Sequence, residues 1–330
     1  MNVTDIHTFT YIKDSSGYIS YIKEILGDMA SVTSVYLPDP HGPIYRAGQT
    51  YTKLISHGLG YEWPYLRARA SATSYDYLHS KAFTDPKTGE ESLTIPLDSI
   101  VEMYDDKQTL HDLINGKLQL PHSDGCQKFT SALKTLNQYI ELDRLGLYGS
   151  LAAQVHKPGS NLCDIDVLVD GIDAYSAVIT MSKGNFVDPV LLSDPIRTNP
   201  IRRQAALRRG QLSQMRLSEF SDTVCDVRIV RLPSDPNTYA ACNKRLEGSA
   251  DINLEGALVT NASESLCLPF AYTITYQGNE YHVIGNYYGF MAAATVGDKV
   301  NVKGLLVDGK YIYISDSTAH YIYDVDSHLM

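Results

Sequence analysis

The sequence predicts an α+β protein, with an α/β core between two mostly β modules. Three observations support this class: the first hundred residues alternate and turn often, apolar stripes at helical spacing follow, and five short strand-like segments come last. At 330 residues, the chain is long enough for two or three domains. We expect a mostly β module over 1–104, a core with a helical lead-in over 105–235, and a small β-barrel over 250–330.

The N-terminal module is predicted from short strand-like segments at 9–12, 18–21 and 34–37. Residues 14–17, Asp-Ser-Ser-Gly, have the composition of a hairpin turn. The sequence assigns no role to this module.

Two apolar stripes predict the helical lead-in to the core. Both repeat at spacings of three to four residues, and Asn115-Gly116 after the first is a typical helix stop. Lys128 and Lys134 are expected to lie off the second stripe. We interpret both helices as packing against the core sheet. The stripes consist of Leu110, Leu113 and Ile114, and of Phe129, Leu133, Leu136 and Ile140.

The most informative segment of the chain is 147–170. Gly149-Ser150 follows a short apolar strand, and a Gly-Ser turn can offer backbone N–H groups and a hydroxyl to a phosphate. Thirteen residues after the turn, Asp164 and Asp166 open an apolar run. Residues two apart in a strand point to the same face, so the two carboxylates are expected side by side. Such charges repel each other unless a cation lies between them, and Mg²⁺ prefers oxygen ligands from carboxylates and phosphates.

A later predicted strand, 224–230, carries another acid, Asp226. Val224, Asp226 and Arg228 would share one face of that strand. Asp226 would then orient an attacking hydroxyl or serve as a third metal ligand. The alternative is a structural salt bridge between Asp226 and Arg228.

A Gly-Ser turn, a helix, an Asp-x-Asp strand and a later strand aspartate together resemble the nucleotidyltransferase superfamily related to DNA polymerase beta. The similarity covers 147–230. It implies a DNA polymerase beta-like core in which Asp164, Asp166 and Asp226 are the catalytic residues and the ligands of Mg²⁺ or Mn²⁺.

The same resemblance implies that Gly149 and Ser150 contact the β- and γ-phosphates of a nucleoside triphosphate. A wider likeness extends over almost the whole chain, to a group of mostly archaeal nucleotidyltransferase-domain proteins with a C-terminal barrel. It includes the segments 36–42, 51–53 and 95–104. This wider likeness implies a chemistry but no acceptor.

A run of arginines is the second distinctive feature. Between residues 197 and 216 there are six arginines and no acidic residue, on a segment predicted as a helix over 201–220. Arg202, Arg209 and Arg216 recur every seven residues and would share a helix face. Guanidinium groups suit phosphates, so Arg202 and Arg209 are candidate nucleotide ligands. The alternative is a solvated face with salt bridges to an acidic body.

The C-terminal segment is predicted as a five-stranded barrel that resembles an OB fold. Its aromatic residues could stack nucleic-acid bases or simply fill the barrel core. Ser160, just before the aspartate pair, could contact the nucleotide or form an ordinary turn. The strands are expected at 257–260, 270–276, 280–284, 299–306 and 311–314, and the aromatic residues are Tyr281, Tyr287, Tyr288 and Phe290.

Composition narrows the functional classes. The net charge of −10 argues against a general nucleic-acid coat, although the arginine run concentrates positive charge locally. No run of eighteen apolar residues is present and the first residues do not have the pattern of a signal peptide, so we expect no membrane span and a cytoplasmic location. The five cysteines form no Cys-x-x-Cys pair, which disfavours zinc and a disulfide framework.

These features favour a Mg²⁺-dependent nucleotidyltransferase. It would move a nucleoside monophosphate from a nucleoside triphosphate (NTP) to an acceptor hydroxyl and release pyrophosphate. A single-stranded nucleic acid or a tRNA is the acceptor that the barrel and the arginines favour. One alternative is a non-catalytic nucleic-acid-binding protein on the same scaffold. Another is a transferase that modifies a small molecule or a protein.

Overall fold

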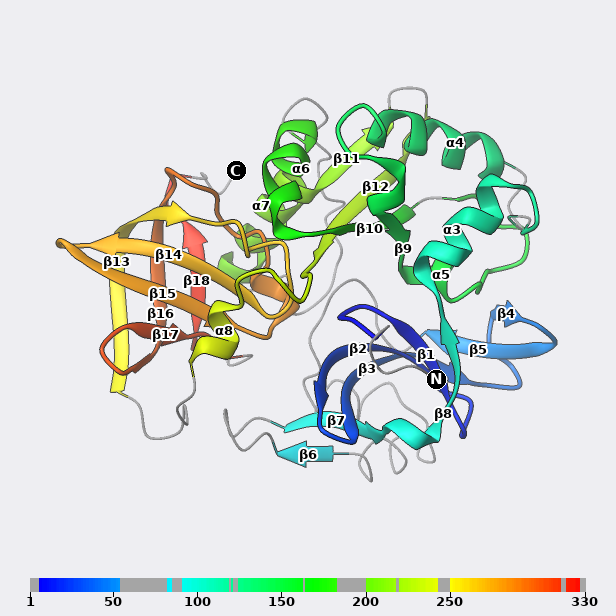
Figure 1. Cartoon of the computed structure of the whole chain (residues 1–330), viewed down its shortest axis with the longest axis horizontal. Helices are drawn as coiled ribbons and strands as arrows, with labels where there is room; N and C mark the ends of the chain where they lie inside the picture. Colours follow the sequence, from blue (N-terminus) through cyan, green and yellow to red (C-terminus); the bar gives the residue numbers. More distant parts are fainter. Residues whose placement is uncertain are drawn as a thin grey trace.

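The computed structural model describes residues 6–53, 82–84, 91–118, 120, 124–162, 164–182, 200–217, 220–242, 250–315 and 319–326. Over these residues the chain is a mixed α+β protein with more strand than helix, which confirms the predicted class. Figure 1 shows a curled N-terminal sheet in blue and cyan, a green helix-and-sheet core above it, and a yellow-to-red barrel at the left. No helix within these ranges is long and apolar enough to cross a membrane.

The N-terminal sheet has eight strands in the order β4-β5-β3-β2-β1-β8, with β7 added on β3 and β6 on β7. Its edges approach each other, because Arg46 on β4 pairs with Glu102 on β8 at 2.5 Å. Strand β3 is buried along nearly its whole length, since it contributes Val32 to the sheet's own core and Tyr36 to the main core. The strands are β1 (Tyr11–Asp14), β2 (Ile19–Leu26), β3 (Met29–Pro38), β4 (Ile44–Arg46), β5 (Gln49–Lys53), β6 (Ala82–Thr84), β7 (Glu91–Pro96) and β8 (Ile100–Tyr104).

The core is a four-stranded sheet in the order β11-β12-β10-β9. Its two central strands, β10 and β12, are parallel, and each outer strand is antiparallel to its neighbour. The elements are α3 (Asp106–Ile114), α4 (Gly125–Leu136), β9 (Leu145–Leu147), α5 (Gly149–Ala152), β10 (Asp164–Asp170), α6 (Tyr175–Ser182), α7 (Pro200–Ser213), β11 (Gln214–Leu217) and β12 (Phe220–Val230). Short 3-10 turns lie at Leu97–Ser99, Leu142–Arg144, Ile172–Ala174 and Tyr288–Phe290.

The prediction of one helix over 201–220 is wrong beyond Ser213. From Gln214 the chain is extended and pairs with β12, and Met215 is fully buried in that pairing. Tertiary pairing has therefore overridden the helical pattern. Arg216 lies on a strand rather than on the helix, so the predicted seven-residue arginine stripe does not exist.

Lys128 is not on the outer side of α4, contrary to expectation. Its side chain is buried, and its ammonium pairs with Asp124 at 2.7 Å and donates to the Leu162 carbonyl at 2.9 Å. The backbone of Leu162 makes two further hydrogen bonds. Its N–H donates to Asp124, and its carbonyl also accepts from the Thr223 hydroxyl. A buried lysine is tolerated here because its charge and its hydrogen bonds are satisfied.

The C-terminal barrel is closed by five strands. The order β13-β14-β15-β17-β16 returns to β13, and only the β15–β17 pairing within the ring is parallel. The five strand segments expected from the sequence correspond to these five strands, so the barrel is confirmed. The elements are α8 (Thr238–Ala241), β13 (Ala250–Asn261), β14 (Phe270–Tyr276), β15 (Asn279–Gly285), β16 (Lys299–Val307), β17 (Tyr311–Tyr313) and β18 (Tyr321–Asp324), the last of which pairs with β16 outside the ring.

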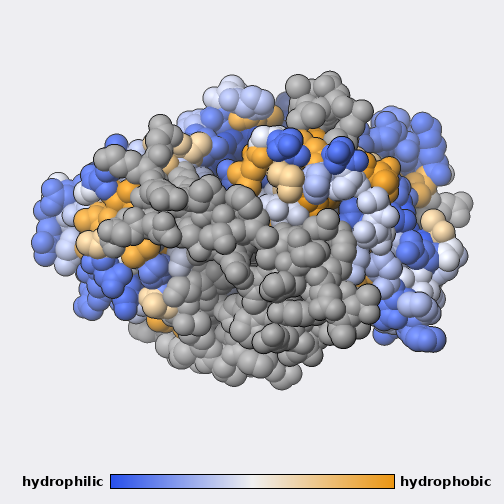
Figure 2. All heavy atoms as spheres, turned by 90° about the horizontal axis from the view of Figure 1, so that it is seen from below, coloured by the Kyte–Doolittle hydropathy of each residue, from blue (hydrophilic) through white to orange (hydrophobic). Residues whose placement is uncertain are grey.

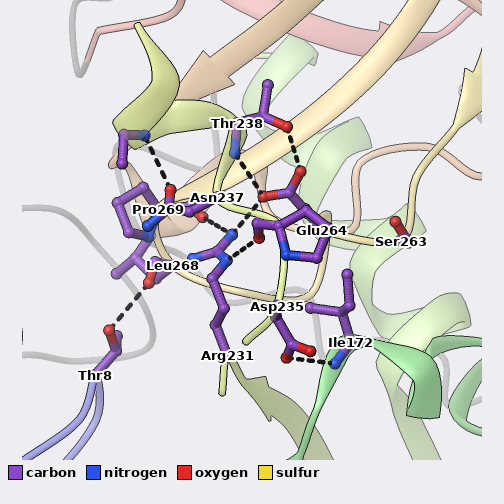
Figure 3. Close-up of polar contacts among 12 residues, drawn as sticks. Thr8, Ile172, Arg231, Asp235, Asn237, Thr238, Ser263, Glu264, Leu268 and Pro269 are labelled. Carbon is purple, nitrogen blue, oxygen red and sulfur yellow. Dashed lines mark hydrogen bonds and ion pairs between the residues drawn. The ribbon is translucent and has the colours of Figure 1, made fainter. Parts of the chain in front are cut away.

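A polar network joins the core to the barrel directly after β12 (Figure 3). The Arg231 guanidinium donates to Glu264 at 2.9 Å, to the Pro269 carbonyl at 3.0 Å and to the Pro236 carbonyl at 2.8 Å. Glu264 also accepts from the backbone N–H of Thr238 at 3.0 Å and from the Thr238 hydroxyl. The N-terminal module contacts the same junction, because the Thr8 hydroxyl donates to the Leu268 carbonyl at 3.1 Å.

The surface seen from below is mainly hydrophilic at its two ends, where the barrel and the outer N-terminal strands lie, with scattered apolar side chains between (Figure 2).

Candidate active site

Two aspartates lie at the start of the central strand β10. Asp164 is its first residue and is exposed, whereas Asp166 is half-buried, and Ile165 between them is fully buried. This alternation places the two carboxylates on the same face of the strand. The expectation of a side-by-side pair agrees with this arrangement.

The third predicted acid lies on the neighbouring parallel strand. Asp226 on β12 is the register partner of Asp166, and Val224 is the partner of Asp164. Neighbouring strands are about 4.8 Å apart, so Asp166 and Asp226 lie in one row across the sheet. The structure therefore brings all three predicted carboxylates onto two adjacent strands.

Asp226 also forms the salt bridge that was the alternative interpretation of its sequence context. The fully buried Arg228 donates from Nη1 to Oδ1 of Asp226 at 2.5 Å and from Nη2 to Oδ2 at 2.6 Å. Arg228 Nη1 further donates to the Ser213 hydroxyl at 3.1 Å. A carboxylate offers about four lone-pair sites, so this bidentate contact fixes Asp226 without using all of its accepting capacity.

The Gly-Ser turn packs directly against the aspartate row. Gly149 has a φ of +72°, and a Cβ at this position would lie 1.9 Å from Oδ2 of Asp166. The positive φ and the lack of space for a Cβ each require glycine at this position. The backbone N–H of Tyr148 donates to the carbonyl of Asp166 at 3.1 Å, which fixes the turn to β10. Ser150 follows in α5 and is partly buried.

The electrostatics of the row disfavour an ionised Asp166. Burial raises its pKa well above the usual range, and the charges of Asp164 and Asp226 raise it further. Lys53 and Arg228 act in the opposite direction without cancelling this effect. A carboxylate in this situation is stabilised by a proton or by a nearby cation.

The pair Asp164 and Asp166 suits a hard divalent cation. Mg²⁺ is commonly held by one or two carboxylates and completes its coordination with water and substrate phosphates. Within the described ranges, no three His, Cys, Asp or Glu side chains converge as a ready-made metal-ligand group. The donor set therefore fits a cation that takes most of its ligands from elsewhere, because Asp226 is already paired with Arg228.

Two residues of the N-terminal sheet reach this site, and the sequence assigned neither of them a role. Burial raises the pKa of Tyr36, and the charges of Asp164 and Asp166 raise it further. Lys53 is the register partner of Tyr36 on the next strand. Both residues lie in segments that carry the wider resemblance, but their position depends on how two sheets dock, which no local pattern encodes.

The remaining candidates have more varied surroundings. The Ser160 hydroxyl donates to the Lys157 carbonyl at 2.7 Å. This is the ordinary turn that was the alternative to nucleotide contact. Arg209 is buried in α7, and its carbonyl accepts from the Ser213 hydroxyl that also contacts Arg228. The side chain of Arg202 lies outside the described residues.

Some arginines and aromatic residues take structural positions. Arg208 pairs with Asp298 at 2.7 Å, which ties α7 to the barrel as its salt-bridge interpretation expected. Tyr287 and Phe290 are buried and pack edge to face at 5.5 Å, so they fill the core rather than offer a base-stacking surface. Tyr281 is half-buried, and the side chain of Tyr288 lies outside the described residues.

No protein-family model matches this sequence, and comparisons with curated proteins and with solved structures give no match either. What the site can do must therefore be inferred from its own residues.

Proposed function

We propose that this protein is a Mg²⁺-dependent nucleotidyltransferase, with a DNA polymerase beta-like core and an OB-like barrel. The observation that carries the proposal is the row of acids: Asp164 and Asp166 on one strand, Asp226 in register on the parallel neighbour, and Gly149 packed against the middle acid. Crowded carboxylates beside a glycine turn suit the binding of a cation and a polyphosphate.

Asp164 and Asp166 would hold Mg²⁺, or Mn²⁺, together with oxygens of the triphosphate. When bound, the cation supplies charge neutralisation for the phosphate oxygens as the leaving group departs. Gly149 lets the backbone of the turn lie directly beside Asp166, because a Cβ at this position would lie 1.9 Å from Oδ2 of Asp166. Ser150 would add a hydroxyl donor.

Asp226 would orient the acceptor hydroxyl, while two hydrogen bonds from Arg228 hold its carboxylate in place. The acceptor oxygen forms a bond to the α-phosphorus of the NTP. The bond between that phosphorus and the bridging oxygen to the β-phosphate breaks, and pyrophosphate leaves with the electron pair. The hydroxyl proton passes to Asp226 and from there to solvent. The protein mainly positions groups in such a reaction.

The acceptor class is less constrained than the chemistry. Residues 250–330 contain nine acidic and three basic residues, so the barrel is an unfavourable surface for a phosphate backbone. A single-stranded nucleic acid or tRNA would then be held by the core and its arginines. No disulfide joins the described cysteines, which suits a reducing cytoplasm.

A non-catalytic nucleic-acid-binding protein is the second candidate. Two observations weigh against it. Arg208, one of the arginines available for a backbone, is occupied by Asp298 and Asp324. A binder would also gain nothing from the unfavourable row of carboxylates.

The direct test is incubation with each labelled NTP, Mg²⁺ or Mn²⁺, and a mixture of tRNA, oligonucleotides and protein, followed by identification of the labelled species. We expect label transfer that chelation of the metal abolishes. Asp164→Asn and Asp166→Asn should each reduce transfer by about 1000-fold or more, because each removes a ligand charge.

Asp173→Asn is the matched control, since Asp173 lies close by in sequence, is largely exposed and pairs with Arg144. Both site variants should unfold at or above the wild-type temperature, because they remove a charge from a repulsive row. Transfer near the wild-type level in both variants would refute the proposal.

A further inference from the structure

The N-terminal sheet is docked onto the segment that follows the Gly-Ser turn. Tyr45 on β4 and His156, four residues beyond α5, exchange backbone hydrogen bonds at 2.8 and 3.1 Å, as in a short antiparallel pairing. Their rings also meet edge to face at 5.7 Å. Figure 1 shows β4 and β5 beneath α5 and β9 accordingly.

A second contact fixes the sheet beside the turn itself. The ring of Phe9 packs at 5.6 Å on Tyr148, the residue that precedes Gly149. The Arg228 guanidinium lies 6.0 Å from the same Tyr148 ring. The N-terminal sheet, the turn and the arginine that holds Asp226 are therefore packed in one continuous unit.

Within this unit, β3 and β5 present a pair of residues to the aspartates. Tyr36 and Lys53 are direct register partners, so their side chains lie on the same face of the sheet. Strand β5 is closely packed, because a Cβ on Gly42 would lie 2.2 Å from the Tyr51 carbonyl. Lys53 ends this strand and is exposed, while Tyr36 beside it is buried.

The position of Lys53 gives it a chemical consequence. Lys53 lies on the same face of β5 as Tyr51, two residues earlier, and Tyr51 packs in the main core together with Tyr148 of the turn. The positive charge of Lys53 also lowers the pKa of the half-buried Asp166, against the effect of burial. Lys53 is thus an exposed positive charge at the edge of a negatively charged row. A lysine in such a place is suited to contact a phosphate as a compact point charge.

We propose that Lys53 binds the polyphosphate of the substrate, so that the N-terminal sheet forms one wall of the nucleotide site. This inference rests on the proposed nucleotidyl transfer and assigns the N-terminal module a role in it. The leaving pyrophosphate gains negative charge as the bond to the α-phosphorus breaks, and Lys53 would stabilise that charge. The competing explanation is that Lys53 only offsets the charge of Asp166.

The two explanations differ in how binding of a metal-free anion responds. We would measure the affinity for inorganic tripolyphosphate by calorimetry in the presence of a chelator, and for ATP and the other NTPs with Mg²⁺. Lys53→Ala should weaken tripolyphosphate binding about tenfold or more, and Lys53→Arg should restore most of it. Lys134→Ala, an exposed lysine on α4, is the matched control and should change neither affinity.

The outcomes separate this inference from the proposed function. Wild-type tripolyphosphate affinity in Lys53→Ala, or no tripolyphosphate binding by a wild-type protein that transfers nucleotides, would overturn the role of Lys53 alone. A wild-type protein that neither transfers nor binds any Mg²⁺-NTP would overturn both. Thermal unfolding of each variant near the wild-type temperature confirms that the exposed substitution leaves the fold intact.

Discussion

Arg228 and Arg231 lie close together at the end of β12, and each pairs with a buried carboxylate. Arg228 donates two hydrogen bonds to Asp226, which lies on the same strand. Arg231 reaches Glu264 in the barrel segment, and Glu264 also accepts two hydrogen bonds from Thr238. The first pair stays within the sheet, whereas the second joins two parts of the molecule.

The difference lies in what surrounds each acid. Asp226 stands in register with Asp166, so its carboxylate belongs to a repulsive row and needs a fixed positive partner. The Glu264 carboxylate accepts three hydrogen bonds from two residues, Arg231 and Thr238, and meets no second acid among its described contacts. The same ion-pair chemistry thus supports a reactive group in one place and a rigid junction in the other.

The largest expected effect comes from Arg228→Met. Removing the guanidinium leaves Asp226 as an uncompensated buried charge, which should cost about 3–5 kcal/mol in the free energy of unfolding. Urea denaturation measures this loss. The double variant with Asp226→Leu should recover much of the stability but no transfer activity. A loss below about 1 kcal/mol for Arg228→Met would show that the pair is not needed to offset the acid row.

A smaller effect is expected from Glu264→Gln at the junction. The variant keeps one acceptor oxygen but loses the charge-assisted hydrogen bonds, so unfolding should become easier by about 2 kcal/mol. Nucleotide transfer should stay within about twofold of wild type, because Glu264 contacts Arg231 and Thr238 rather than the row of aspartates. A twofold change in rate corresponds to under 1 kcal/mol. Glu280→Gln on the exposed barrel surface is the control. Lost transfer with unchanged stability would place the junction in the reaction instead.

The smallest effect is expected from Ser213→Ala. Its hydroxyl accepts from Arg228 and lies 3.4 Å from Asp226, so its removal should cost about 1 kcal/mol and reduce transfer less than tenfold. Ser182→Ala is a close control, because this buried serine makes the same kind of bond to its helix and touches no acid. Equal losses of transfer in both variants would mean that Ser213 does not support Asp226.

Local sequence patterns predicted the parts of the fold that depend on near neighbours. Strand β14 was expected over the residues that form it, and alternation alone placed Asp164 and Asp166 on one face. The sequence also placed Asp226 on a later strand, but its register with Asp166 was not predicted and is given by the structure. Whether these residues carry out the proposed chemistry remains a prediction.

Features that depend on distant segments were not predictable. The helix expected over 201–220 ends at Ser213, and the following residues form β11 because they pair with β12 further along the chain. Lys53 comes close enough to influence the pKa of Asp166 only because the N-terminal sheet is docked on the core. Both cases reflect pairing between surfaces, to which composition and periodicity are insensitive.

The buried ammonium of Lys128 has a consequence for the precision of β10. The Lys128 ammonium donates to the carbonyl of Leu162, and the N–H of Leu162 donates to Asp124. Leu162 lies two residues before Asp164, the first aspartate of β10. A slip of β10 by one position would turn every side chain to the opposite side, moving both aspartates into the hydrocarbon interior. Such a slip would also take the Leu162 carbonyl away from the Lys128 ammonium, so this buried contact favours the observed register of β10.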